Sequence, residues 1–289
     1  MKKGLSGNTR GLIKLTVLRV IVYAILIFLC ILCLFFFYLM LVNASRSNAQ
    51  LATGFSLVPQ ENFFKNLVNA WNDSSINIPR GMLNSLIIAL ATAVLTTYFS
   101  ALTAYGVHAY EFKGKKFVFT FIIAVMMIPS QVSALGFIQM MNKFHLNNSY
   151  IPLIVPGIAA PVVFFYMKQY MESVLPLDVI DAARVDGSGE FRTFNTIVLP
   201  MLKPAIAVQM IFSFVSSWNN YFIPALLLDK AEMKTVPIMI AQLRSADYSK
   251  FDMGKVYMFI LLAILPVLIT YIFLSKSIIK GVTAGSVKG

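Results

Sequence analysis

Residues 181–200 read DAARVDGSGEFRTFNTIVLP, a polar and acidic stretch set between long apolar segments of the chain. The region from 172 to 200 contains only two basic residues, Arg184 and Arg192, against five acids: Glu172, Asp178, Asp181, Asp186 and Glu190. An amphipathic elbow that lies on a membrane usually carries Lys and Arg on its polar face. This composition therefore favours a surface that docks another protein, although a simple connecting elbow stays the alternative.

Two short helices are predicted within this stretch. Pro176 suits the first turn of a helix, because its missing N–H costs nothing there, and the helix should continue to about Asp186. Gly187 should end it, since glycine enters the left-handed region freely. A second helix should begin near Glu190, whose charge complements a helix start. Its apolar face, read at helical spacing, comprises Phe191, Phe194 and Ile197 or Val198.

The composition of the whole chain indicates an all-α, polytopic membrane protein. Of 289 residues, 58% are hydrophobic and 12% are charged, whereas soluble domains carry about 25% charged residues. The mean hydropathy of +0.76 agrees with this class. The net charge of +12 does not indicate nucleic-acid binding, because the basic residues flank apolar runs, as expected for loops beside membrane spans.

Six apolar segments are each long enough to cross about 30 Å of hydrocarbon as a helix. They are residues 17–42, 82–108, 116–142, 150–171, 202–228 and 255–276. The fourth is interrupted by Pro152, Pro156 and Pro161. We therefore expect residues 1–289 to form a single transmembrane domain with six helices, in which 172–201 is the loop between the fourth and fifth spans.

The distribution of basic residues predicts the orientation of these spans. With six crossings, both termini lie on the same side as the 109–116 and 172–201 loops. Fifteen of the 24 Lys and Arg residues fall on that side and nine on the other. Cytoplasmic loops carry the excess of Lys and Arg, so both termini and the 172–201 segment are expected in the cytoplasm.

No Asp, Glu, Lys, Arg or His lies in the middle of any predicted span. Ion-coupled carriers usually need ionisable groups at membrane depth, so the energy for transport should come from a partner. A secondary carrier coupled to sodium through carbonyls and hydroxyls stays open. The spans also lack paired catalytic groups, and Cys30 and Cys33 have no second Cys/His cluster. Neither a catalytic site nor a metal site is predicted.

The spacing within 181–200 resembles the EAA loop of permease subunits of binding-protein-dependent ABC importers. The loop's pattern is matched by Asp181-Ala182-Ala183, by Gly187 after three intervening residues, and by Ile197, Leu199 and Pro200. Asp181 stands where the family has glutamate, which shortens the side chain by one methylene and keeps its charge. The resemblance implies that this loop docks on an ATPase subunit through Asp181, Ala182, Ala183, Asp186 and Gly187.

The resemblance extends to the maltose-type (MalG-like) carbohydrate permeases. The residues that carry it are Asn84-Ser85-Leu86, Trp218-Asn219, Lys234-Thr235-Val236-Pro237 and the tail Lys280–Gly289. It implies a type I ABC importer permease fold in a bacterial cytoplasmic membrane, forming half of the path for a sugar or oligosaccharide. The implied partners are a second permease, two ATP-binding subunits and an extracytoplasmic solute-binding protein. An ion-coupled secondary sugar carrier is the alternative function.

Residue type also decides what is expected for cofactor binding and for the sugar path. Gly187-Ser188-Gly189 lacks the Lys-Ser/Thr ending of a phosphate-binding loop, so ATP and Mg²⁺ are expected on the partner subunits and no cofactor on this chain. Polar and aromatic side chains within the spans suit a sugar path, although such residues also join membrane helices. The candidates are Gln131, Ser217, Trp218, Asn219, Asn220 and Tyr221.

Overall fold

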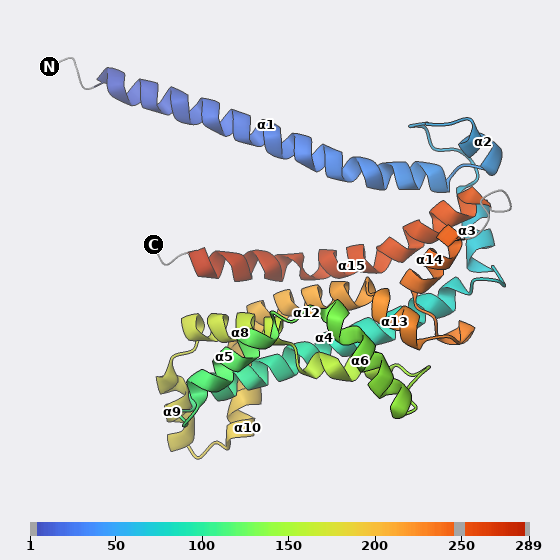
Figure 1. The fold of residues 1–289 in the computed structure, drawn as a ribbon. Helices are drawn as coiled ribbons and strands as arrows, with labels where there is room; N and C mark the ends of the chain where they lie inside the picture. Colours follow the sequence, from blue (N-terminus) through green and yellow to red (C-terminus); the bar gives the residue numbers. More distant parts are fainter. Residues whose placement is uncertain (1–4, 246–251, 287–289) are drawn as a thin grey trace. The chain divides into compact units, whose positions relative to one another are not determined.

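The computed structural model describes residues 5–245 and 252–286, and within those ranges every regular element is helical (Figure 1). The chain divides into two compact units. One comprises Met1–Ala70 and Asp247–Leu261, and the other comprises Trp71–Ala246 and Leu262–Gly289. The single domain over 1–289 stays a prediction. Residues 287–289 of the predicted family tail lie outside the described residues.

The first unit is built around a long apolar helix and two short ones that follow it. The elements are α1 (Leu5–Ala44), α2 (Asn48–Ala52), α3 (Phe63–Trp71) and the beginning of α15 (Met253–Ser286). The buried Asn66 amide joins them by donating to the carbonyls of Ala44 and Arg46 at 2.8 and 2.9 Å. Gly254 lies so close that a Cβ there would be 2.4 Å from the Arg46 carbonyl oxygen. This close approach explains the glycine at the start of α15.

The second unit contains the remaining helices, with α4 at its centre, packed against α8 and α12 (Figure 1). Helices α9 and α10 lie at one end of these three helices, and α13 and α14 lie toward the other end. The elements are α4 (Ile78–Ala109), α5 (Lys115–Val125), α6 (Ser130–Lys143), α7 (Ile151–Ile154), η1 (Val155–Ile158), α8 (Pro161–Val174), α9 (Leu177–Val185), α10 (Glu190–Thr193), η2 (Phe194–Val198), α11 (Leu199–Met201), α12 (Lys203–Trp218), α13 (Phe222–Leu227), η3 (Ala231–Met233) and α14 (Val236–Ser245).

Among the described residues, four helical stretches are long and apolar enough to span a membrane: Lys14–Ala44, Ile78–Ala109, Ile151–Val174 and Met253–Phe273. A fifth arises if Glu190–Met201 and Lys203–Trp218, which are bent by 84° relative to one another, are taken as one broken span. The structure therefore confirms a helical, multi-pass architecture with four or five candidate spans. The predicted number of six spans is not confirmed by the described residues.

Two segments expected as single helices are interrupted, which corrects that expectation. Residues 116–142 divide into α5 and α6, and Pro129 is the residue immediately before α6. Residues 202–228 divide after Trp218, and α13 begins only at Phe222 with Pro224 in its first turn. A proline removes a helical N–H and clashes with the carbonyl four residues earlier, so both breaks lie where a proline forbids continuation. The proline-rich fourth segment is divided as well, into α7, η1 and α8, and Ile151–Val174 still qualifies as one candidate span.

Candidate functional site

Helix α9 presents one face to the core and the other to the exterior. Ile180 and Ala183 are buried, whereas Asp181 and Ala182 are exposed. Ala183 therefore does not belong to the exposed surface expected from the docking motif. The Val185 side chain is 87% exposed. Such an exposed apolar side chain contributes nothing to the core. Val185 is therefore an apolar group on the outward face of α9, which the sequence did not indicate.

Gly187 ends α9 in the way that its position in the sequence predicted. Its φ is +76°, in the left-handed region that glycine adopts without a steric penalty. Its N–H donates to the Arg184 carbonyl at 3.0 Å, and the Ser188 N–H donates to the Ala183 carbonyl at 2.9 Å. These two bonds form a Schellman motif. The glycine is thus needed for backbone geometry, and the space around its Cα is open.

Arg184 holds the two helices of the segment together. Its guanidinium donates to Asp181 at 3.0 Å within α9 and to Glu190 at 2.8 Å at the start of α10. The same guanidinium lies 5.2 Å from the centroid of the Tyr110 ring, a cation–π distance. These contacts raise the pKa of Arg184, and the Arg184 guanidinium lowers the pKa of the Glu190 carboxyl to about 2. Both charges persist at neutral pH.

A second set of contacts joins the segment to α4. The Tyr105 hydroxyl donates to Glu190 at 2.8 Å. Phe194 is fully buried, with its ring centroid 5.5 Å from that of Tyr105 and 5.7 Å from that of Tyr98. Val198 is buried in the same cluster. The segment is therefore attached to α4 by the Tyr105–Glu190 hydrogen bond and by the buried Phe194 and Val198 side chains.

The predicted apolar face of the second helix is confirmed in part. The helix begins at Glu190, as expected, and Phe194 and Val198 point into the core. Phe191 does not, because its side chain is 67% exposed. The chain from Phe194 to Val198 is wound as a π-helix, which shifts the buried face relative to regular helical spacing. Phe191 thus joins Val185 as an exposed apolar residue of this segment.

The candidate residues of the substrate path lie at the two breaks in the interrupted segments. Asn219, Asn220 and Tyr221 are exposed between α12 and α13. Gln131 is exposed in the first turn of α6, directly after the other break. Ser217 is half-buried. Helices α6 and α13, which follow the two breaks, contact each other.

Trp218 is placed differently from its neighbours. Its side chain is 3% exposed, its ring stacks on that of Phe214 at 5.9 Å, and its Nε1 donates to the Ala263 carbonyl at 3.1 Å. All of its contacts are therefore those of a packing residue between α12 and α15. Packing between membrane helices is the alternative to a role in the sugar path, and for Trp218 the structure favours packing.

Two other sequence motifs meet in space. The Asn84 amide donates to the carbonyls of Glu232 and Lys234, both at 2.9 Å, and the Ser85 hydroxyl accepts from the Val236 N–H at 2.9 Å. Val236 packs in the same cluster as Trp218. Three motifs that are far apart in the sequence therefore form one structural unit around the start of α4.

The chain is similar to known proteins over most of its length. Residues 97–276 match the family described as "Binding-protein-dependent transport system inner membrane component". The arabinooligosaccharides transport system permease protein AraQ of Bacillus subtilis is 36% identical over 88% of this chain and 89% of its own length. The trehalose/maltose transport system permease protein MalG of Thermococcus litoralis is 30% identical over 91% of this chain and 94% of its own length.

A solved structure shares the fold. It is a chain from the crystal structure of a bacterial ABC transporter involved in the import of the acidic polysaccharide alginate. The TM-score is 0.79 at 19% sequence identity, over 90% of this chain and 96% of that chain. The likeness at this identity concerns the fold.

Proposed function

We propose a function for this chain from one premise: it belongs to the family of binding-protein-dependent transport system inner membrane components. It is accordingly a permease subunit of an ABC importer and not an enzyme, and ATP hydrolysis belongs to separate subunits. An ion-coupled carrier gains no support from the relatives. The substrate is a sugar or oligosaccharide, because the relatives named for arabinooligosaccharides, trehalose and maltose, and lactose all carry saccharides.

One observation supports the coupling mechanism: the 177–201 segment has an outward-facing surface and is attached to α4. Asp181, Ala182, Val185 and Asp186 face outward, which supports docking into a cleft on an ATPase subunit. Glu190, which accepts a hydrogen bond from Tyr105, and Phe194 tie the segment to α4. Closure of the two ATPase subunits on ATP and Mg²⁺ would move the docked helix, and α4 would follow as a rigid body.

The complete assembly in this proposal contains four membrane-associated subunits. A second, homologous permease forms the other half of the path, two ATPase subunits dock on the cytoplasmic side, and a solute-binding protein delivers the sugar from outside. Both termini lie in the cytoplasm, and six segments cross a bacterial cytoplasmic membrane. The α5–α6 and α12–α13 segments supply the third and fifth crossings as broken helices, which membrane proteins tolerate where they line a cavity.

The substrate path in this proposal runs past the two breaks. Free helix ends and side-chain amides at a break can hydrogen-bond sugar hydroxyls, as transporter sites at broken helices do for other solutes. Asn219 and Asn220 would supply amides from one break and Gln131 from the other. The Tyr221 ring would stack on a sugar face. Ser217 lies in the last turn of α12, beside the break, and would contribute a hydroxyl.

The docking surface can be tested with matched substitutions of one residue type. Val185→Asp places a charge on the outward tip of α9, and Val58→Asp places the same charge on another exposed valine, 62% accessible, in the predicted extracytoplasmic loop. Each variant would be co-expressed with its partner subunits and purified. We expect V185D to lose the ATPase subunits and V58D to retain them. Recovery of the ATPase subunits with V185D at the wild-type ratio would refute docking through α9.

A further inference from the structure

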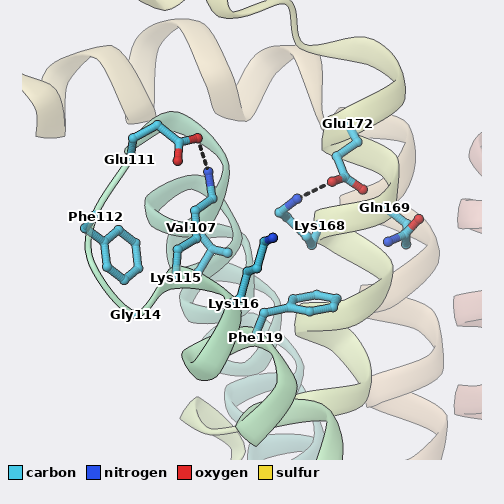
Figure 2. A pocket seen from close by; sticks show the side chains of 10 residues that line it. All are labelled: Val107, Glu111, Phe112, Gly114, Lys115, Lys116, Phe119, Lys168, Gln169 and Glu172. Carbon is cyan, nitrogen blue, oxygen red and sulfur yellow. Dashed lines mark hydrogen bonds and ion pairs between the residues drawn. The ribbon is translucent and has the colours of Figure 1, made fainter.

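A pocket of about 630 Å³ lies between α4, α5 and α8 at the end of the unit that carries α9 (Figure 2). Three lysines line it: Lys115 and Lys116 from the start of α5, and Lys168 from α8. Lys168 is 7% exposed, which is unusual because lysines are seldom buried. The rest of the lining includes the apolar side chains of Val107, Phe112 and Phe119. The pocket therefore combines basic groups with an apolar wall.

The charges of the pocket do not cancel. Glu111 pairs with Lys115 at 2.7 Å, and Glu172 pairs with Lys168. Lys115 lowers the pKa of Glu111, so that carboxylate stays ionised beside its lysine. Lys116 makes no hydrogen bond or ion pair with any residue in the described part of the chain, and Figure 2 shows its side chain extending toward the Lys168–Glu172 pair. One positive charge in the pocket is thus uncompensated.

The backbone adds to this positive potential. Helix α5 begins at Lys115 after Gly114, whose φ is +91°, and no side chain caps its first turn. The uncapped N–H groups and the helix dipole favour a negative charge at such an end. The pocket is lined by the first residues of this helix, so the dipole and Lys116 act on the same space.

We propose that this pocket binds the phosphate group of an anionic phospholipid. Lysine binds phosphate as a point charge, and basic pockets between transmembrane helices are a known way to hold anionic headgroups. Phe112 and Phe119 also line the pocket and would offer apolar surface to the start of an acyl chain. The pocket adjoins the ends of α4 and α8, two candidate membrane spans, which is where headgroups lie. The inference requires only that these helices cross a membrane.

The test uses the purified full-length chain in detergent, with thermal unfolding as the readout. Phosphatidylglycerol should raise the unfolding temperature in a saturable manner, and phosphatidylcholine should not. Lys116→Gln should weaken the apparent affinity for phosphatidylglycerol by roughly fivefold, the effect of one lysine near an anionic lipid. Lys113→Gln is the matched control, since Lys113 is exposed, as Lys116 is, lies in the loop just before α5 and does not line the pocket.

Three outcomes would overturn the proposal. Equal stabilisation by both lipids would remove the requirement for an anionic group. An equal loss of affinity in K113Q and K116Q would assign the effect to diffuse surface charge instead of the pocket. Inorganic phosphate that reproduced the whole shift in the presence of phosphatidylcholine would identify a free anion, and not a lipid, as the ligand. A loss confined to K116Q with phosphatidylglycerol supports the proposal.

Discussion

The geometry at Gly187 gives a quantitative prediction for the end of α9. Alanine in the left-handed region costs about 1–2 kcal/mol, and the reduced freedom of the opened segment offsets about 0.4–1 kcal/mol of this. Gly187→Ala, at a φ of +76°, should therefore destabilise the local structure by about 1 kcal/mol, which corresponds to a roughly fivefold change in an opening equilibrium. Gly187→Asn should cost less, since asparagine tolerates this region.

Hydrogen exchange on the purified chain would measure this opening directly. The reporters are the backbone N–H groups of residues 187 and 188, which donate to the carbonyls of Arg184 and Ala183. In G187A they should exchange about fivefold faster. Gly189→Ala is the control, because Gly189 has φ −67° and open space around it, so exchange should not accelerate. Equal exchange in G187A and G189A would show that the glycine is not needed for the cap.

Further predictions concern the core contacts and the ion pair. Asn84→Ala leaves the carbonyls of Glu232 and Lys234 without their donor and should lower the free energy of unfolding by roughly 1–3 kcal/mol, so an unchanged thermal transition would contradict the bridge. Trp218→Phe keeps the stacking and loses one hydrogen bond, which should cost about 1 kcal/mol, whereas a loss of transport at unchanged stability would assign the ring to the path. The folded pKa of Glu190, about 2, lies below its ordinary value of 4.5, so its stabilising effect is complete above that value and is lost as pH falls toward 2. The difference in unfolding temperature between wild type and Glu190→Gln should therefore shrink over this range, and a constant difference would contradict the ion pair.

The sequence predicted the local structure of the docking segment because the determining signals are local. A proline before the first turn, a glycine four residues after the second alanine, and an acid at the next helix start each act on their own backbone. The structure confirms helix boundaries near Pro176 and Gly187 and a new start at Glu190. The docking role itself stays a prediction.

The faces of these helices could not be predicted in the same way. Ala182 and Ala183 are identical in type, yet one is exposed and the other buried, because burial depends on where α4 lies and not on the residue. Phe191 and Phe194 differ for the same reason, and the π-helical turn after Phe194 alters the spacing on which a face is read. Val185 carries no signal at all in the sequence, since a valine in a short helix is normally a core residue.

The breaks in the third and fifth segments were foreseeable in part. Hydropathy is averaged over about 19 residues, so a single proline such as Pro129 or Pro224 hardly changes the average of a long apolar run. Each of these prolines nevertheless prevents an unbroken helix. In the fourth segment, three prolines suggested an interruption, and the structure divides it into α7, η1 and α8. There Pro152, Pro156 and Pro161 each occur in the first turn of a short helical element, the position at which a proline costs least.

The attachment of α9 has a mechanical consequence that the motif alone does not reveal. A partner that moves the outward face of α9 acts on a helix whose last turn is ion-paired to Glu190, and Glu190 is itself hydrogen-bonded to Tyr105 of α4. Phe194, fully buried against that helix, would have to leave the core for α9 to move alone. Exposing a phenylalanine costs roughly 1.5–3 kcal/mol, in addition to the loss of the ion pair. Displacing α4 together with α9 breaks none of these contacts, so the lowest-energy response to a force on the segment is movement of the two helices as one body.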